Sequence, residues 1–484
     1  MTAPRIQVLG AAALCALIAG CTVGPNYKRP TAPVPPAFKE IAPPPSIPNG
    51  SWKQVQPSDQ VLRGKWWEIY NDPQLNALEE KVAISNQTLK AATEQYFSAR
   101  AAIQTYRANY FPTLSAGPAI SRQHLSNTRP TYVPGAVSQY NDFVLAGQAS
   151  WEPDLWGQVR RSVESARASA QASAADLANV ELSVRSELAQ DYFELRGLDL
   201  QKQLLDNTVI SYADYLNLTR TRFKGGVATD SDVALAETQL KSTQAQDIDV
   251  GVARAQYEHA IATLIGEPAS SFGLAQAPLS LPLPQVPPGL PSQLLERRPD
   301  IAGMERRADA ANAQIGIAIS AYYPNITLTG TGGFESKNPG TWIQGPSSLW
   351  SLGASASELL FDAGRRHAVT EEARDNYEVT VANYRESVLN AFQEVEDNLA
   401  ALRILDEESV TQAAAVAAAE RSLRISTTRY KQGLDDYLVV LVAQTTLLTN
   451  QRTQADITTR QFAANVLLIK ALGGGWDTTQ LPKL

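Results

Sequence analysis

The sequence predicts a mainly α-helical chain that also contributes to a β-barrel and is arranged as two tandem structural repeats. The stretch RFKGGVATDSDVALAETQL, from Arg222, returns 207 positions later as RYKQGLDDYLVVLVAQTTL, from Arg429. A constant offset of this kind indicates a repeated structural unit. Two stretches without proline and almost without glycine are typical of very long helices. Before each of them, two segments of roughly ten residues alternate between apolar and polar side chains, as β-strands do.

The composition limits the class of protein. The chain has 484 residues, of which 44% are hydrophobic and 19% charged, with a formal net charge of −7. Since lysine and arginine are scattered and the balance is acidic, we expect no nucleic acid partner. Only 7% of residues are aromatic, which suits long helices in close contact better than a thick globular core.

The first twenty residues, MTAPRIQVLGAAALCALIAG, show the basic residue, apolar run and small residues of a secretory signal peptide. The last of them, Ile18-Ala19-Gly20, together with Cys21 resemble a bacterial lipobox, whose cysteine is diacylated and becomes the mature N-terminus. An ordinary signal with an incidental cysteine is the alternative. Thr22 follows the cysteine instead of the aspartate that resembles an inner-membrane retention signal, which favours the outer membrane.

Proline-rich segments divide the rest of the chain. We expect residues 1–20 to be the signal peptide, 21–65 a lipidated strap, 66–277 the first repeat, 278–297 a link and 298–484 the second repeat. No apolar run of eighteen or more residues follows residue 20, so if the mature chain spans a membrane it must do so as strands.

Each repeat is predicted to begin with a helix and continue with a strand pair. One helix is expected from Asp72 to about Ala108, and another from Pro299 to just before Tyr323-Pro324. The strands follow at once, around Leu114–Ile120, Phe143–Trp151, Ile326–Thr329 and Trp350–Ser357. Their alternation fits outer-membrane strands facing lipid and a lumen, and equally well soluble hairpins packed on a core.

The long helices are predicted from Gln158 to about Lys224 and from Arg365 to about Lys431, or roughly 100 Å each. Apolar residues follow a seven-residue step along both, which indicates packing against other helices. Gly225, Gly226 and Gly433 can end these helices, and each chain is expected to return as a helix of about 35 residues. Thr229 or Asp230 is the expected cap of the first return helix, and Asp435 that of the second.

Four strands cannot close a barrel, and lipid does not tolerate open strand edges. If the strands span a membrane, chains must therefore combine them. Two chains would give eight strands around a filled interior, whereas three would give twelve around an aqueous lumen. If something must also pass through the barrel, a homotrimer with a 12-stranded transmembrane barrel follows, and the same symmetry gathers the helices into a barrel about as long as a periplasm is deep.

Several short motifs are spread over nearly the whole chain: the CTVGPNY stretch from Cys21, WWEIYNDPQL from Trp66, Asn86, RPDI from Arg298, Tyr323-Pro324, FDAGR from Phe361 and ALGGGW from Ala471. Together these motifs resemble the NodT-type lipoproteins of the TolC-like outer membrane factor family. The resemblance implies a homotrimeric tunnel with a β-barrel in the outer membrane and an α-barrel in the periplasm. It also implies three kinds of contact: outer membrane lipid, a periplasmic adaptor protein, and an inner-membrane pump, most often of the resistance-nodulation-division type.

The resemblance further implies a periplasmic gate after the second turn. Its constriction corresponds to Leu438 and Val442, and many relatives carry carboxylates where this chain has Val439 and Val442. This departure predicts a drier and less cation-selective constriction. Packing of Val439, Val440 and Val442 between helices is the alternative. Asp435 and Asp436 could line the pore, although capping explains Asp435 more simply.

The remaining candidate residues are at the two ends of the helical body. The exposed tips, where an adaptor would dock, comprise Gly225, Gly226, Val227, Thr229, Gly433 and Leu434. The candidates for a membrane-interface girdle are Tyr110, Phe111, Tyr322 and Tyr323.

No catalytic constellation is present in the sequence, and the three histidines, His124, His259 and His367, are isolated. We therefore expect no cofactor, no metal site and no enzymatic activity. The main hypothesis is an outer membrane channel of a tripartite efflux system that conducts substrates passively. The alternative is a structural periplasmic coiled-coil lipoprotein without a channel.

Overall fold

A computed structural model describes residues 22–40, 64–131, 133–287 and 291–484. The first repeat contains η1 (Trp66–Tyr70), α2 (Pro73–Ser85), α3 (Gln87–Ala108), β1 (Thr113–His124), β2 (Gln139–Trp151), α4 (Gln158–Lys224) and α5 (Asp230–Leu264). The second contains α6 (Leu294–Arg297), α7 (Pro299–Ser320), β3 (Asn325–Ser336), β4 (Ser348–Ser357), α8 (Arg365–Lys431) and α9 (Tyr437–Ala471). Short 3-10 turns η2 to η6 lie between these elements and after α9.

The tandem repeat is confirmed in the helices. α4 and α8 each have 67 residues, and α5 and α9 each have 35. The second helix of each pair begins 207 positions after the first, as the repeated sequence requires. None of the helices in the described ranges is long and apolar enough to cross a membrane.

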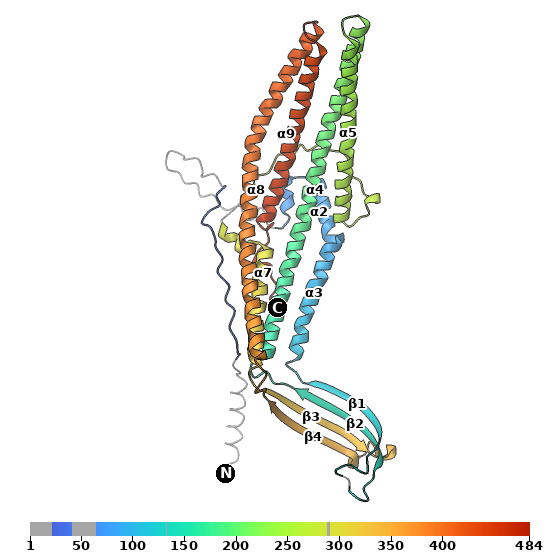
Figure 1. Cartoon of the computed structure of the whole chain (residues 1–484), viewed down its shortest axis with the longest axis vertical. Helices are drawn as coiled ribbons and strands as arrows, with labels where there is room; N and C mark the ends of the chain where they lie inside the picture. The colour runs from blue at the N-terminus through green and yellow to red at the C-terminus, as the bar shows by residue number, and fades with distance from the viewer. Residues whose placement is uncertain (1–21, 41–63, 132, 288–290) are drawn as a thin grey trace.

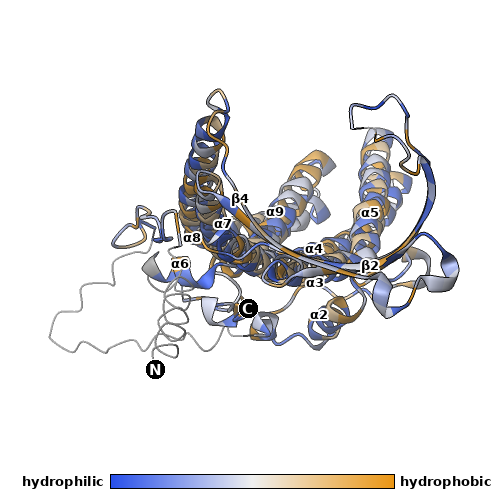
Figure 2. Ribbon diagram, turned by 90° about the horizontal axis from the view of Figure 1, so that it is seen from below, coloured by the Kyte–Doolittle hydropathy of each residue, from blue (hydrophilic) through white to orange (hydrophobic). Residues whose placement is uncertain are grey.

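The chain is elongated and has two different ends. The hairpins α4–α5 and α8–α9 point toward one end, and the four strands extend from the other end at an angle to the helices (Figure 1). Seen from the strand end, the sheet forms an arc, with α5 and α9 on its concave side and α2, α6 and the C-terminus on its convex side (Figure 2).

The four predicted strands form one antiparallel sheet in the order β1-β2-β3-β4. The pairing of β2 with β3 joins the two repeats, for example at Leu145 opposite Phe334. β1 and β4 each have a single neighbour, so the sheet has two open edges. Leu114 and Leu352 on it are about 80% exposed, because none of the helices in the described residues covers the sheet.

The two repeats share one core in the middle of the helical body. α4 packs against α3, α5, α7 and α9, and α8 packs against α7 and α9. The Phe193 ring on α4 lies 4.7 Å from the Tyr70 ring of η1 and 4.7 Å from the Phe462 ring of α9. The Tyr70 hydroxyl donates to Asn465 Oδ1 of α9 at 2.7 Å. Residues far apart in sequence therefore fix the long helices relative to each other.

The prediction of one helix from Asp72 to Ala108 was wrong, because the segment divides at Asn86 into α2 and α3. Asn86 has an extended ψ of 122°, and its side chain accepts from the Leu89 amide as an N-cap. The same side chain donates to the Leu264 carbonyl at the end of α5, at 2.7 Å. The Asn86 side chain thus provides hydrogen bonds to the first turn of α3 and to the last carbonyl of α5. These bonds compensate for the backbone hydrogen bonds that are lost where the helix is interrupted.

The described part of the strap, residues 22–40, is extended and lies along the helical body. Near its start, the Val23 amide donates to the Trp156 carbonyl at 3.2 Å, and near its end Phe38 is buried in the core. The amides of Lys39 and Glu40 donate to the Glu396 carboxylate at 2.7 and 3.0 Å. Cys21 and the signal peptide lie outside the described residues.

Candidate functional site

The first hairpin ends in a tight turn at Gly225 and Gly226. Gly226 has φ +75°, a conformation that favours glycine, and the Val227 amide donates to the Arg222 carbonyl at 3.0 Å. Thr229 then caps α5 in a capping box, in which its amide donates to Asp232 Oδ2 at 2.8 Å and the Asp232 amide donates to Thr229 Oγ1 at 3.2 Å. The sequence predicted either Thr229 or Asp230 as the N-cap of α5, and in the structure the N-cap is Thr229.

The second hairpin has the same backbone turn but a different cap. Gly433 has φ +79°, and the Leu434 amide donates to the Arg429 carbonyl at 3.0 Å. The prediction that Asp435 caps α9 was wrong, because the N-cap residue is Asp436 and its side chain makes no capping hydrogen bond. Asp435 instead accepts two hydrogen bonds from the Arg429 guanidinium, at 2.6 and 2.8 Å. This guanidinium holds the pKa of the Asp435 carboxyl below its usual value.

Both turns are exposed. Val227 is 65% and Leu434 62% exposed, and the three turn glycines and Thr229 are exposed as well. The tips therefore present small and apolar residues at the end of the helical body (Figure 1). Docking of an adaptor at these residues stays a prediction.

The two hairpins are joined toward the tips by a buried cluster that includes Leu216 and Val440, and by a hydrogen bond of 2.7 Å between the Tyr215 and Thr427 hydroxyls. Beyond these lies a set that we call the tip contact: Thr219 and Arg222 of α4 with Tyr430 and Lys431 of α8. The Arg222 guanidinium carbon lies 4.6 Å from the centre of the Tyr430 ring, and Arg222 Nη1 donates to the Lys431 carbonyl at 3.2 Å. The Tyr430 hydroxyl donates to Thr219 Oγ1 at 3.3 Å. The contact between Arg222 and Tyr430 was not predicted from the sequence.

The predicted gate residues lie on one face of the first turns of α9. Leu438, Val439 and Val442 are 55%, 44% and 59% exposed within the chain, whereas Val440 is fully buried. The three exposed residues line a groove of about 380 Å³ against α8, together with Ala419, Ser422 and Ser426. Val440 therefore packs between helices of the same chain, as the alternative to a gate predicted. Val439 and Val442 are exposed within the chain and can contact another chain or a pore.

The four predicted interface aromatics lie where the helices meet the sheet. Tyr110 and Phe111 follow α3, and Tyr322 and Tyr323 follow α7. Phe111 is 70% exposed, and the Tyr323 ring stacks on Trp156 at 4.9 Å. Trp156 donates its indole N–H to the Pro324 carbonyl at 2.8 Å. Trp156 and the exposed Leu360 after β4 were not predicted, because both lie in connections where periodicity gives no signal. Phe361, also exposed after β4, was named only as part of the FDAGR motif.

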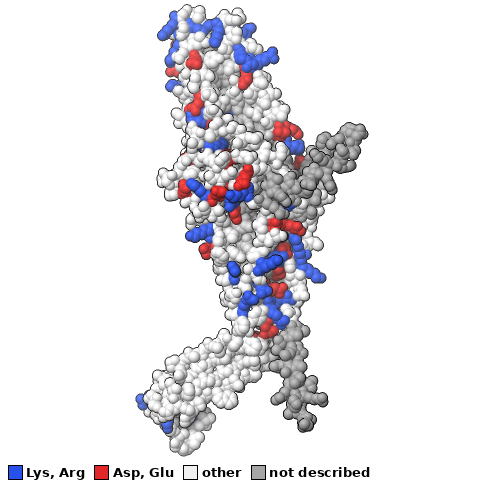
Figure 3. All heavy atoms as spheres, turned by 180° about the vertical axis from the view of Figure 1, so that it is seen from behind, with Lys and Arg blue, Asp and Glu red and all other residues white. Residues whose placement is uncertain are grey.

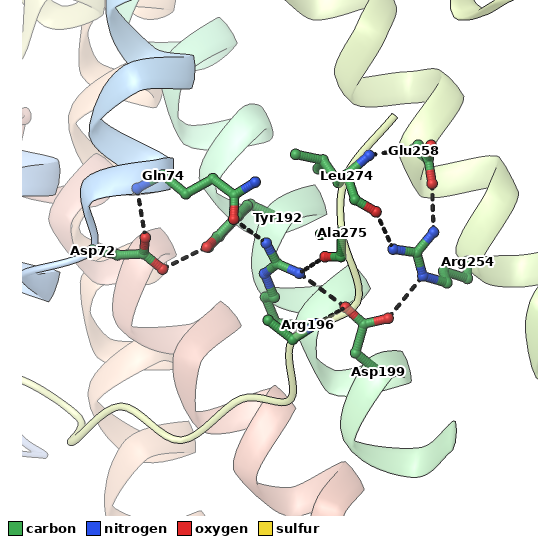
Figure 4. Close-up of polar contacts among 10 residues, drawn as sticks. Asp72, Gln74, Tyr192, Arg196, Asp199, Arg254, Glu258, Leu274 and Ala275 are labelled. Atoms are coloured by element: carbon green, nitrogen blue, oxygen red, sulfur yellow. Dashed lines mark hydrogen bonds and ion pairs between the residues drawn. The ribbon is translucent and has the colours of Figure 1, made fainter. Parts of the chain in front are cut away.

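A buried polar network fixes the middle of the helical body (Figure 4). Asp199 of α4 accepts from Arg196 at 2.9 Å and from Arg254 of α5 at 2.7 Å. These arginines also donate to the carbonyls of Ala275 and Leu274, at 2.8 and 2.7 Å. Asp72 accepts from the Tyr192 hydroxyl on the other side of the network. Since each of these buried charges has a partner, the network has a structural role and holds together α2, α4, α5 and the segment that follows α5, at Leu274 and Ala275.

Charged side chains are distributed unevenly along the molecule. Figure 3 shows Lys, Arg, Asp and Glu over the helical body, whereas the sheet carries almost none except at its far tip. His124, His259 and His367 are on β1, α5 and α8. Within the described ranges no three potential ligands are grouped in a way that could hold a metal ion.

The comparisons with known proteins agree with this arrangement. The sequence model of a family described as outer membrane efflux protein matches residues 78–267 and 290–474. The chain is similar to the probable efflux pump outer membrane protein TtgC of Pseudomonas putida, with 31% identity over 97% of this chain and 96% of that protein. It is also similar to the pyoverdine export outer membrane protein OpmQ of Pseudomonas aeruginosa, with 32% identity over 85% and 87%.

A solved structure has the same fold. The outer membrane channel CmeC of Campylobacter jejuni superimposes with a TM-score of 0.86 at 25% identity, over 95% of this chain and 96% of that one. The long helices, the tandem repeat and the four strands therefore match a known channel fold.

Proposed function

This chain belongs to the outer membrane efflux protein family, and we propose that three copies of it form one tunnel that conducts exported molecules from the periplasm to the exterior. The chain is an outer membrane efflux channel, and its relatives support this function and not a spacer without a channel. Its family is one of transport proteins.

The single observation that supports a trimer is the form of the sheet. The edge strands β1 and β4 each leave one side without a partner strand, and both faces of the sheet are uncovered in the described part of the chain. In a bilayer each open edge must pair with another strand. Three chains close twelve strands into a barrel wide enough for a lumen, and the concave side of the arc then becomes the lumen wall.

The same arrangement supports a lipid anchor at Cys21. A side chain on Gly157, the cap residue before α4, would meet Thr22, so the strap reaches the junction of helix and sheet one residue after the cysteine. An acyl chain on that cysteine would enter the lipid beside the exposed aromatics of the junction. Tyr110, Phe111, Tyr322 and Tyr323 form the interface girdle in this proposal.

The gate forms where three copies of α9 meet at the far end of the tunnel. Leu438, Val439 and Val442 face the axis and exclude water from the constriction, because rings of apolar side chains close a pore by dewetting. Asp435 is held by Arg429, and Asp436 leaves its carboxylate at the mouth of the pore. The gate opens when the α8–α9 hairpin moves away from α4, which requires the tip contact to break.

The partners follow from the relatives, which are outer membrane components of efflux pumps. A periplasmic adaptor protein would dock on the tips at Gly225, Gly226, Val227, Thr229, Gly433 and Leu434. An inner-membrane pump, of the resistance-nodulation-division type, would supply the energy.

The first experiment measures the molar mass of the detergent-extracted protein by light scattering, corrected for bound detergent. A Cys21→Ser form exported by a signal peptide without a lipobox separates the barrel from the lipid anchor. We expect a trimer that still needs detergent. A monomer that is soluble without detergent would overturn the proposal.

A further inference from the structure

The two faces of the sheet differ in chemistry. Strand pairing puts most of its large apolar side chains on one face, which we call the apolar face, including Leu114, Ile120, Phe143, Leu145, Trp350 and Leu352. The opposite face carries small and polar side chains such as Ser115, Gln148 and Thr331. In the barrel of the proposed function, on which this inference rests, the apolar face meets lipid.

Polar residues replace the apolar ones where this face reaches the far tip of the sheet. Ile120 is followed on the same face of β1 by Arg122 and His124. Asn141 of β2 lies opposite Arg122, and Gln139 lies opposite His124. Arg122, His124, Gln139 and Asn141 are all exposed, and we call them the collar. The collar therefore borders the apolar face at the end of β1 and the start of β2.

The collar lies at the height of lipid headgroups. Arg122 is nine residues beyond Thr113, the first residue of β1. At about 3.4 Å per residue and a strand tilt of about 35–45°, this separation spans about 22–25 Å across the membrane, close to the height of the apolar band of outer-membrane barrels, about 25 Å. Next to the collar the Phe143 ring lies 5.6 Å from the Trp342 ring, and aromatic residues are typical of this boundary. The helical body is on the periplasmic side, so the collar is level with the outer leaflet.

Charges at the far tip are sorted between the two faces. The carboxylates on this end of the strands, Asp142 and Glu335, are both on the face opposite the collar. The connections 125–138 and 337–347 contain no aspartate or glutamate in the sequence, but they contain Arg129 and Lys337. Figure 3 shows Lys and Arg side chains at this tip. Among the described residues no carboxylate forms an ion pair with Arg122, so its charge is available to a partner outside the chain.

The chemistry of the collar suits a phosphate group. A guanidinium can form two parallel hydrogen bonds with phosphate oxygens, and the amide side chains of Asn141 and Gln139 add neutral donors beside it. A carboxylate on the same face would repel the phosphate, and none is present on this end of the strands. The apolar face directly below the collar, at Ile120 and Phe143, suits the acyl chains of a lipid.

We propose that the collar binds the phosphorylated amino-sugar backbone of lipid A, the glycolipid of the outer leaflet, with Arg122 as its phosphate ligand. The headgroup phosphates of this lipid lie at the height of the collar, and its acyl chains lie along the apolar face. Such binding fixes the depth of the barrel in the membrane from the outer side, as a lipid on Cys21 would fix it from the periplasmic side.

The test uses the full-length protein in detergent and two probes. Diphosphoryl lipid A is compared with monophosphoryl lipid A of the same acyl chains, which lacks one phosphate and keeps the apolar contacts. Binding is measured by native mass spectrometry after light scattering has established the molar mass of each variant. Arg122→Gln removes the charge and Arg122→Lys keeps it. Arg421→Gln is the matched control, because it removes an exposed arginine from α8, away from the sheet.

We expect the unaltered trimer to prefer the diphosphoryl lipid. Arg122→Gln should weaken its binding about fivefold, the effect of one basic residue at an anionic lipid surface, and should reduce the preference for the second phosphate. Arg122→Lys should keep most of the affinity, and Arg421→Gln all of it. Equal affinities of Arg122→Gln and the unaltered trimer overturn the proposal, and so does an equal loss in Arg421→Gln, which would leave only an effect of net charge. A protein that is not a trimer overturns the barrel as well, so the two failures are distinguishable.

Discussion

Removing Arg222 should open the channel, because this residue makes two of the three interactions of the tip contact. Arg222→Gln loses the cation over the Tyr430 ring and the hydrogen bond to the Lys431 carbonyl. A cation–π contact at an exposed site contributes about 0.5–1 kcal/mol, and a hydrogen bond that involves a charged group about 1.5–3 kcal/mol. Solvent screening reduces the sum to about 1 kcal/mol per chain.

In the proposed trimer this effect is multiplied by three. If the three tip contacts of a trimer break together, the closed state loses about 3 kcal/mol, which shifts the ratio of closed to open channels by about a hundredfold. The assay is single-channel recording in planar lipid bilayers at constant salt, with open probability as the readout. Tyr430→Phe keeps the ring and loses only the hydrogen bond to Thr219, so its effect should be smaller.

Arg220→Gln is the matched control. Arg220 lies two positions away on the same helix, and its partner Glu237 belongs to the same hairpin, at 3.3 Å. The variant therefore removes the same charge without touching the second hairpin. Equal open probabilities for Arg222→Gln and Arg220→Gln would refute the role of the tip contact and leave only an effect of tip charge.

Three further predictions concern the gate and the helical body. Val442→Asp should raise the cation-to-anion permeability ratio in bilayer recordings, because it adds three carboxylates to a dry constriction; an unchanged ratio would remove Val442 from the pore lining. Burial, helped by two neighbouring carboxylates, raises the pKa of Asp191 from 3.8 to about 7. Its stabilising contribution is complete below pH 3.8 and lost as the pH rises through 7, so Asp191→Asn should raise the thermal unfolding midpoint at pH 8 and hardly change it at pH 4. A Cβ on Gly197 of α4 would collide with Thr459 of α9, so Gly197→Ala should reduce the free energy of unfolding by about 1–3 kcal/mol and lower the thermal midpoint. In the control Gly251→Ala the added Cβ meets nothing within 4 Å, so this variant should raise the midpoint slightly. Equal midpoints for the two variants would contradict close packing of α4 on α9.

The sequence predicted the long helices well because their signals are local. Absence of proline permits α4 and α8, and glycines with positive φ end the turns after them at Gly226 and Gly433. The strand pairs were found for the same reason, since alternation is visible within ten residues. The break at Asn86 was missed because the bond that holds its side chain to Leu264 connects positions 178 residues apart.

The tip contact could have been found by comparing the two repeats. Arg222 and Arg429 occupy equivalent positions, 207 residues apart. Arg429 is neutralised by Asp435, but the position equivalent to Asp435 in the first repeat is Ala228. Arg222 therefore has no carboxylate across its own turn, and it packs on Tyr430 of the other hairpin. Differences between repeats, rather than their similarity, indicate where the repeats contact each other.

The same comparison argues that the gate has threefold and not sixfold symmetry. The exposed Leu438 and Val439 on α9 correspond to Ser231 and Asp232 on α5. Asp232 forms the capping box with Thr229. Ser231 and Asp232 are both polar, so they cannot form an apolar ring that excludes water from a pore. In the proposed trimer six hairpins can therefore build a nearly uniform wall, while Leu438 and Val439 of the three second-repeat hairpins add apolar surface to the proposed gate that the first repeat lacks at these two positions. Exchanging Leu438 and Val439 for Ser and Asp should accordingly leave the wall intact and raise the resting conductance.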